Sequence, residues 1–170
     1  MEAWLAIASR REIRDYAETP IPAEAEERIL DAGRLTGSAQ NRQPWRFLIV
    51  ENEETCEQLA ELVFEPGNIR RARLVVAIVV SGKGPVFFDA GRCAQNMMLA
   101  AWDQGIGSSP NGMPDADAVT ALLELADGER PAIILSFGYP AKPRDPSARA
   151  PDEWSARAKR KPLDELVERL

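Results

Sequence analysis

The segment Ser38-Ala-Gln-Asn-Arg-Gln-Pro-Trp45 interrupts a helical pattern with side chains that form hydrogen bonds rather than pack in a core. Gly37 allows the preceding helix to end tightly, and Pro44 favours an extended Gln43, so the chain enters the next strand in a fixed direction. The amide, hydroxyl and guanidinium groups of this segment could recognise the edge of a flat, heteroatom-rich ligand. A polar surface loop that caps a helix is the alternative.

Composition limits the classes of function. A chain of 170 residues can form one domain, residues 1–170, with one buried core. Its 21 Lys and Arg residues against 27 Asp and Glu residues give a net charge of −6, which argues against nucleic acid as the main partner. The chain has no histidine, so imidazole triads and the commonest metal ligand are excluded. Any chemistry must therefore come mostly from a cofactor or from carboxylates, and we expect no bound metal.

Cysteine usage and hydropathy bear on the compartment. Cys56 and Cys93 lie in segments with helical periodicity and have no second cysteine at metal or redox spacing, which favours buried structural thiols in a reducing cytoplasm. Residues 1–9 are too short for a secretory signal. The longest aliphatic run, residues 74–80, is too short to span a membrane. We therefore expect a soluble cytoplasmic protein without a membrane partner.

Hydrophobic periodicity predicts an alternation of helices and strands. Helices are expected at residues 3–9, 23–35, 53–64, 88–104 and 115–125, and apolar strands at residues 45–50, 74–80 and 131–137. The unbroken β-branched run at 74–80 is typical of a central strand. Residues 105–112 are expected to form a glycine-containing loop whose amides could approach a planar ligand, with a plain turn as the alternative. Residues 141–152, rich in Pro, Arg and Ala, are expected to form an extended arm.

The helix at residues 88–104 is rich in small side chains, which let two backbones approach closely. We expect it to pack tightly against the sheet or against a second subunit. Its small residues are Ala90, Gly91, Ala94, Ala100 and Ala101.

Two basic clusters lie near the ends of this acidic chain. The first contains Arg10, Arg11 and Arg14, and the second contains Arg157, Lys159, Arg160 and Lys161. An anion bound between such groups would turn their mutual repulsion into charge-assisted hydrogen bonds of about 1.5 to 3 kcal/mol each. A solvated charged turn and a charged helix start are the alternatives. Flavin mononucleotide would account for both clusters and both polar loops, because it has a dianionic phosphate, an apolar dimethyl edge and a polar pyrimidine edge.

With these motifs in their order, the chain resembles the short form of the nitroreductase family of FMN-dependent oxidoreductases. Arg10-Arg11-Glu12-Ile13-Arg14 resembles the family's basic opening Arg-Arg-Ser-x-Arg, and Ser38 to Trp45 resembles its loop Pro-Ser-Ser-x-Asn-x-Gln-Pro-Trp. Asp89 to Gly107, with Ala94-Gln95-Asn96 and Gly105-Ile106-Gly107, resembles its central helix and glycine exit, and Lys159-Arg160-Lys161-Pro162-Leu163 resembles its closing basic motif. The resemblance covers nearly the whole chain.

The resemblance implies an α+β sandwich with a mostly antiparallel sheet flanked by helices, and an intertwined homodimer with its active site at the subunit interface. The C-terminal arm and tail, residues 141–170, are expected to contact the partner subunit. By motif, five basic residues would hold the phosphate or the ring edge: Arg10, Arg11, Arg14, Lys159 and Lys161.

The resemblance also assigns polar and backbone contacts to the flavin. Asn68 would touch the ring; Ser38, Ala39 and Asn41 would come from the other subunit; and Asn111 and Gly112 would supply backbone groups near the reactive ring face. No residue is assigned as catalytic, since water at the open face could protonate the product.

Three positions depart from the family's pattern. Glu12 stands where Ser is usual, and a carboxylate near a phosphate is unfavourable unless it turns away or pairs with an arginine. Gly37 and Ala39 replace the family's Pro and Ser, which removes a side-chain hydrogen bond at position 39 but leaves the backbone path intact.

The expected activity is hydride transfer from NADH or NADPH through FMN to a nitroaromatic, a quinone or a similar conjugated acceptor, in a ping-pong cycle. The protein would contribute groups that stack on the flavin ring, a hydrogen-bond donor near flavin N5 and positive charge near flavin N1 and O2. Three alternatives remain. The first is a family relative with different flavin chemistry, which would dehalogenate, reduce enals or fragment flavin. A long lid insertion over the site would favour this alternative, but the connections in this chain are short. The others are a non-catalytic or sensory flavin-binding dimer and a partner-binding domain without a cofactor.

Overall fold

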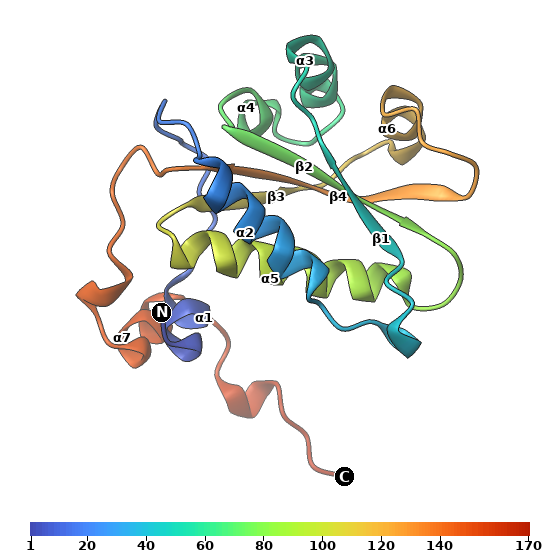
Figure 1. Ribbon diagram of the computed structural model, residues 1–170. Helices are drawn as coiled ribbons and strands as arrows, with labels where there is room; N and C mark the ends of the chain where they lie inside the picture. Colours follow the sequence, from blue (N-terminus) through green and yellow to red (C-terminus); the bar gives the residue numbers. More distant parts are fainter. The chain divides into compact units, whose positions relative to one another are not determined.

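A four-stranded antiparallel sheet with the strand order β1-β2-β4-β3 organises residues 11–144 (Figure 1). The computed structural model describes all residues from 1 to 170, which form two units: Arg11–Arg144, and Met1–Arg10 together with Asp145–Leu170. The strands are β1 (Trp45–Ile49), β2 (Leu74–Ser81), β3 (Gly107–Asn111) and β4 (Glu129–Gly138). The expected antiparallel α+β architecture is confirmed.

The central strand β2 is buried on both faces, as its sequence predicts. Seven consecutive residues, from Leu74 to Val80, are buried, and β2 pairs with β1 on one side and β4 on the other. Alternate side chains enter two different cores because successive residues of a strand point to opposite faces. Val76 and Ile78 belong to one core, whereas Val75 and Ala77 belong to the other, so the sheet divides the single buried core expected from the chain length.

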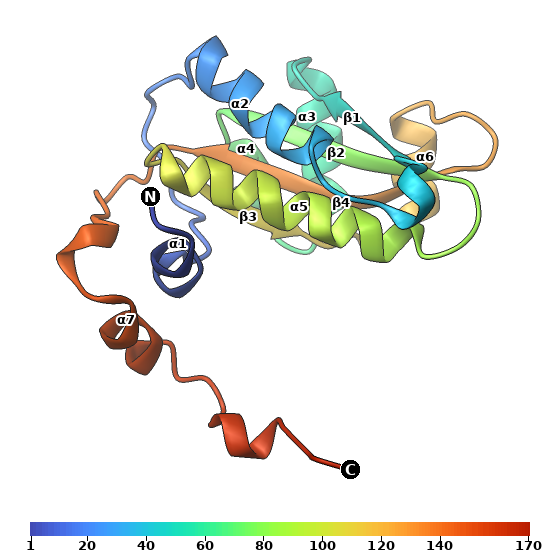
Figure 2. The same cartoon turned by 60° about the horizontal axis from the view of Figure 1, so that its bottom comes forward.

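Each core is closed by its own set of helices (Figures 1 and 2). On one face, α2 (Ala23–Arg34) and α5 (Val86–Asp103) pack side by side, with Ile29 and Met97 fully buried between them and the sheet. A Cβ atom on Gly33 would lie 2.8 Å from the ring of Phe47, so glycine permits the close approach of α2. The other face is covered by α3 (Glu53–Glu61), α4 (Pro66–Arg70) and α6 (Ala116–Leu122).

Strand β3 corrects the expectation of a loop at residues 105–112. Gly107 to Asn111 pair with β4 in register, with Ser109 opposite Ser136. The segment Gly-Ser-Ser-Pro-Asn has low strand propensity, but the free edge of β4 supplies its hydrogen bonds, and an edge position tolerates Pro110. A Cβ atom on Gly107 would lie 2.6 Å from the Cβ atom of Ile13, so the close approach of the N-terminal segment requires glycine here.

A second difference concerns the connection after α3. This helix ends at Glu61 rather than near Phe64, and Pro66 opens the short helix α4 at its first turn. Proline suits that position because its missing N–H would have no partner inside the helix.

The smaller unit combines the two ends of the chain. It contains α1 (Ala3–Ser9), η2 (Pro146–Ala148), α7 (Pro151–Arg157) and η3 (Leu163–Glu165), and α1 packs against α7. Glu2 caps α1 by accepting hydrogen bonds from the N–H groups of Trp4 and Leu5, both at 2.9 Å. The segment expected as an extended arm thus holds a 3-10 turn and the start of a helix. None of the helices combines the length and the apolar character that crossing a membrane requires.

Candidate functional site

The loop after α2 is held by its own first residues. The Ser38 hydroxyl accepts a hydrogen bond from the Gln43 N–H at 2.8 Å, and the Ser38 carbonyl accepts one from Asn41 at 3.0 Å. The Ala39 N–H donates to Oδ2 of Asp89 at 3.2 Å. Ser38 and Ala39 therefore fix the path of the loop, whereas the Asn41 carboxamide is exposed.

Backbone conformation in this loop is unusual for non-glycine residues. Gln40, Asn41 and Gln43 have φ angles of 55°, 54° and 48°, in the left-handed region, so the extended Gln43 expected before Pro44 is not found. Such a conformation costs of the order of 1 kcal/mol or more per residue, and least for Asn. The hydrogen bonds of Ser38 and Asp89 maintain it. Because strained backbone is concentrated at ligand-binding sites, the geometry favours a binding loop over a plain helix cap.

Asp89 is a site residue that the sequence analysis did not identify. It lies in the first turn of α5 and is 3% exposed, and its carboxylate is 3.7 Å from the guanidinium of Arg92. The available signal was a single carboxylate among apolar neighbours, in the segment Val86-Phe-Phe-Asp-Ala. Burying a carboxylate costs free energy unless it is hydrogen-bonded. The Ala39 N–H of the loop supplies such a bond to Asp89.

A buried amide pair lies across the sheet from this loop. Asn68 of α4 and Asn111 at the end of β3 are 4% and 3% exposed, and Nδ2 of Asn68 donates to Oδ1 of Asn111 at 2.8 Å. Nδ2 of Asn111 in turn donates to the carbonyls of Ser109 and Ile134, at 3.1 and 3.2 Å. The carbonyl contacts fix which end of the Asn111 amide faces Asn68. Asn68 must consequently use its nitrogen there, and its oxygen is left for another donor.

The amide pair continues into a buried hydroxyl pair. Nδ2 of Asn111 lies 3.1 Å from Oγ of Ser136, and the Tyr16 hydroxyl donates to the Ser136 carbonyl at 3.1 Å. Burial raises the pKa of Tyr16 to about 12, so the phenol stays protonated as a donor. The hydroxyl of Ser109, beside this network, is buried without a hydrogen-bond partner.

An exposed aromatic ring lies beside the end of β3. The Phe64 N–H donates to the carbonyl of Gly112 at 3.1 Å, and a Cβ atom on Gly112 would lie 3.1 Å from the Phe64 ring, which is 70% exposed. The hydrophobic periodicity had placed Phe64 at the end of the helix predicted for residues 53–64. Its exposure next to Gly112 was not readable from the sequence.

The basic residues are divided between the two units. Arg11 and Arg14 belong to the larger unit, whereas Arg10, Lys159 and Lys161 belong to the smaller one. The side chains of Arg14, Lys159 and Lys161 are exposed and form no ion pair, unlike those of Arg34, Arg46, Arg70 and Arg92. The remaining predicted contacts, Ser38, Ala39, Asn41, Asn68, Asn111 and Gly112, all lie in the larger unit.

Comparison with known proteins decides the family. A family model described as the nitroreductase family matches residues 7–85 and 80–139. The chain belongs to the nitroreductase family. One relative is an Archaeoglobus fulgidus protein named as an NADH dehydrogenase/NAD(P)H nitroreductase. It is 34% identical to this chain over 150 residues, and the match covers 82% of this chain and 86% of the relative.

Further relatives show the breadth of the nitroreductase family. A Thermotoga neapolitana protein named iodotyrosine deiodinase is 26% identical over 163 residues, with 79% of this chain and 87% of that protein covered. The crystal structure of a nitroreductase family protein from Clostridium difficile 630 superposes with a TM-score of 0.82 at 24% identity, covering 99% of this chain and 98% of that one. The superposition confirms the nitroreductase fold.

The residues of this nitroreductase-family chain fit a flavin mononucleotide. Arg14, Lys159 and Lys161 are cations without a carboxylate partner in a chain of net charge −6, and are therefore open to a phosphate. The Asn68 oxygen forms no hydrogen bond and is not among the fully buried unpaired atoms, so it is open to an N–H of a ligand. Gly112 presents backbone without a side chain beside an exposed aromatic ring.

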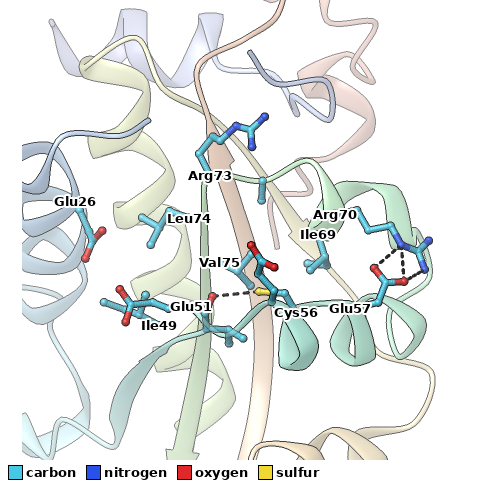
Figure 3. Close-up of a pocket in the computed structure, with 13 residues that line it drawn as sticks. Glu26, Ile49, Glu51, Cys56, Glu57, Ile69, Arg70, Arg73, Leu74 and Val75 are labelled. Carbon is cyan, nitrogen blue, oxygen red and sulfur yellow. Dashed lines mark hydrogen bonds and ion pairs between the residues drawn. The ribbon is translucent and has the colours of Figure 1, made fainter. Parts of the chain in front are cut away.

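Figure 3 shows a hollow of about 590 Å³ that is lined mainly by residues of α3, α4 and β2 and by the segment at the end of β1. Within this hollow, Arg70 pairs with Glu57, and the Cys56 thiol donates to the Val50 carbonyl at 3.2 Å. Burial raises the pKa of this thiol. None of the predicted flavin contacts lines the hollow, so it is not the flavin site.

Proposed function

We propose that this protein passes hydride from NADH or NADPH through bound FMN to a nitroaromatic, a quinone or a similar conjugated acceptor. As a nitroreductase, it is an NAD(P)H-dependent flavin oxidoreductase with FMN as its cofactor. The match of the family model across residues 7–139, which contain the sheet and α5, carries the proposal. Bound FMN would supply the hydride chemistry between the nicotinamide and a second substrate in the same site, and we expect ping-pong kinetics from this arrangement.

The residues of the chain would bind and orient the cofactor. Arg14 and Lys161 supply positive charge for the phosphate or the pyrimidine edge, together with Arg10, Arg11 and Lys159. The free oxygen of Asn68 accepts a hydrogen bond from a ring N–H. The backbone of Asn111 and Gly112 supports the ring, since the Asn111 side chain is already engaged with Asn68 and Ser136.

Two subunits would be needed to complete this site. The loop of Ser38, Ala39 and Asn41 is anchored to α5 on one face of the sheet, whereas Asn68 lies in α4, which covers the other face. A homodimer would bring the loop of one protomer to the amide pair of its partner. This arrangement supports the proposal that the active site lies at the subunit interface.

The visible spectrum of the purified protein tests the cofactor. We expect flavin absorbance, or its appearance when FMN is added to the apoprotein. Oxidation of NADPH should then accelerate when a quinone or a nitroaromatic compound is added, with parallel double-reciprocal plots from the ping-pong cycle. A protein that stays colourless with added FMN would refute the proposal, and a yellow protein without turnover would indicate a sensory flavin-binding dimer.

Reductive dehalogenation is a second candidate, favoured by the relative named iodotyrosine deiodinase. The short connection between α3 and β2, which holds only the five residues of α4 as a helix, argues against it because it leaves no room for a long lid. Release of iodide from iodotyrosine by the reduced enzyme would establish this activity.

A further inference from the structure

Phe64, in the connection between α3 and α4, has a side chain that is 70% exposed on a backbone held from both sides. Its N–H donates to the Gly112 carbonyl at 3.1 Å, which ties the connection to the segment after β3. Val63 beside it is 4% exposed and packs in the core that α3, α4 and α6 cover. Pro66 restricts the backbone at the first turn of α4. The place of the exposed ring is therefore set by the packing around it.

One side of the Phe64 ring lies against the backbone of Gly112. A Cβ atom at Gly112 would lie 3.1 Å from Cδ2 and 3.2 Å from Cε2 of the ring. Both distances are shorter than the optimal separation of two carbon atoms, about 3.5 to 4.0 Å. A side chain at position 112 would therefore displace the ring, and glycine lets the ring stay beside this backbone.

No arginine covers the Phe64 ring, in contrast to two other exposed phenylalanine rings. Phe87 and Phe88 of α5 are 49% and 68% exposed. The guanidinium carbon of Arg130 lies 4.8 Å from the centroid of the Phe87 ring, and that of Arg92 lies 5.8 Å from the centroid of the Phe88 ring. The Phe64 ring has no such partner and belongs to neither core. Its exposed face is therefore open to a planar ring from outside the chain.

The neighbours of Phe64 distinguish it from an exposed apolar side chain elsewhere on the surface, which needs no explanation by itself. Gly112 contacts the ring directly, and Asn68 lies four residues further along the chain in α4. The Asn68 side chain is in turn bonded to that of Asn111 at 2.8 Å. These three neighbours are the residues of the larger unit that the proposed function assigns to the flavin ring. The exposed ring of Phe64 thus lies among the groups proposed to contact the flavin.

We propose that Phe64 is a specificity-determining residue whose ring stacks on the planar ring of the electron acceptor. The proposal rests on the proposed function, in which the acceptor is a nitroaromatic, a quinone or a similar conjugated compound. An aromatic side chain offers such a compound a large apolar surface and a π face, and offset stacking of two rings adds to the free energy of burial. The contact grows with the area of the ring system. Phe64 therefore favours acceptors with fused rings over acceptors without a ring.

Steady-state kinetics of the FMN-loaded enzyme test this role in the variants F64A, F64L and F64Y. The acceptors are menadione with two fused rings, 1,4-benzoquinone with one ring, and ferricyanide, which has no ring and takes one electron at a time. E65Q is the matched control, because it changes the adjacent exposed side chain, which forms no cap hydrogen bond to α4. Flavin fluorescence gives the dissociation constant of FMN, and stopped-flow absorbance gives the rate of flavin reduction by NADPH.

We expect F64A to lower kcat/KM for menadione by about three- to tenfold, through a higher KM at an unchanged kcat, because a contact made equally in the ground state and the transition state is lost. The loss should be smaller with 1,4-benzoquinone and below about twofold with ferricyanide. F64L should resemble F64A, and F64Y should resemble the wild type, because the proposal requires an aromatic ring rather than apolar bulk. E65Q should keep every constant within about twofold.

Equal losses with menadione and ferricyanide, or an F64L variant that matches the wild type, would overturn the proposal. A change confined to FMN binding or to the NADPH step would also overturn it, since the ring would then contact the flavin or the nicotinamide. The melting temperature of each variant checks folding. Ferricyanide separates the two levels of inference: if the wild type oxidises NADPH with it and F64A keeps all wild-type constants, only the role of Phe64 fails. A wild type that oxidises NADPH with none of the acceptors would overturn the proposed function as well.

Discussion

Asn111 has more hydrogen-bond partners than any other side chain described around the site. Its nitrogen serves two carbonyls and lies near Oγ of Ser136, and its oxygen accepts from Asn68. All of these groups lie in the interior, where a polar group without a partner costs about 1 to 3 kcal/mol. The residue therefore orders the end of β3 at the same time as it orients Asn68.

Truncation of Asn111 tests this view. We expect N111A to lower the free energy of unfolding by about 3 kcal/mol or more, because it leaves the Asn68 Nδ2 without its acceptor and takes one donor from each of the carbonyls of Ser109 and Ile134. Urea denaturation followed by circular dichroism measures the change. As a control, Q58A removes an exposed amide bonded only to Glu54 and should change stability by less than about 0.5 kcal/mol. A loss below about 1 kcal/mol in N111A would mean that water replaces the side chain.

Tyr16 gives the network a dependence on alkaline pH. Its folded-state pKa of about 12 lies above the ordinary value of 10.0, because burial disfavours the phenolate. The resulting stability is complete below pH 10 and is lost as the pH rises towards 12. We expect the difference in unfolding free energy between the wild type and Y16F to shrink across this window. A difference that stays constant from pH 9 to 12 would contradict a buried, protonated phenol.

For single residues, the sequence predicted which residues belong to the candidate site better than it predicted their hydrogen-bond partners. Asn68 and Asn111 were both assigned to the ligand site from motifs, but no local pattern indicates that they bind each other across 43 positions. Asp89 was missed for the same reason. Its hydrogen bond to the Ala39 N–H joins residues that only the fold brings near.

The outer strand β1 is tied to β4 by an ion pair that spans β2. The guanidinium of Arg46 makes two contacts with the carboxylate of Glu129, at 2.6 and 2.7 Å, and the same carboxylate accepts a hydrogen bond from the Ala126 N–H at 3.0 Å. Arg46, followed by that N–H, lowers the pKa of Glu129 to about 2. The contact helps to hold the strand that follows the candidate binding loop.

The sign of this shift predicts acid sensitivity. A carboxylate with a lowered pKa stabilises the folded state above its ordinary pKa of 4.5, and the contribution is lost as the pH falls towards 2. We expect E129Q to be less stable than the wild type near neutral pH and the difference to disappear between pH 4.5 and 2. Urea midpoints at a series of pH values measure it. R46K serves as a partner variant, since it keeps the charge but loses the two-pronged geometry; if it matched the wild type at every pH, the paired contact would be unimportant.

Among the elements, those with strong periodicity were predictable. The β-branched run of β2 and the amphipathic pattern of α2 gave their type and approximate bounds, because burial requires those patterns. β3 was not predictable, since Gly107-Ser-Ser-Pro-Asn becomes a strand only through the edge of β4. The strained loop of Gln40 to Gln43 was recognised as polar, but its left-handed backbone depends on the distant Asp89.

At the scale of the whole molecule, the two basic clusters are divided between the two units. Arg14 belongs to the sheet-containing unit, and Lys161 belongs to the unit formed by the two chain ends. Motif order alone assigned both to one cofactor.

Removal of both charges tests the shared ligand. We expect R14A combined with K161A to weaken FMN binding by well over tenfold, because about two charge-assisted contacts are lost together. R28A combined with K83A removes two exposed charges elsewhere and should leave the affinity within about twofold. Titration of flavin fluorescence measures both pairs, and sedimentation velocity checks that each variant keeps the oligomeric state of the wild type. Because two cations around one phosphate act on the same group, the double variant should lose less affinity than the product of the single losses. Strictly multiplicative losses would indicate separate sites, and an unchanged affinity would remove Arg14 and Lys161 from the cofactor site altogether.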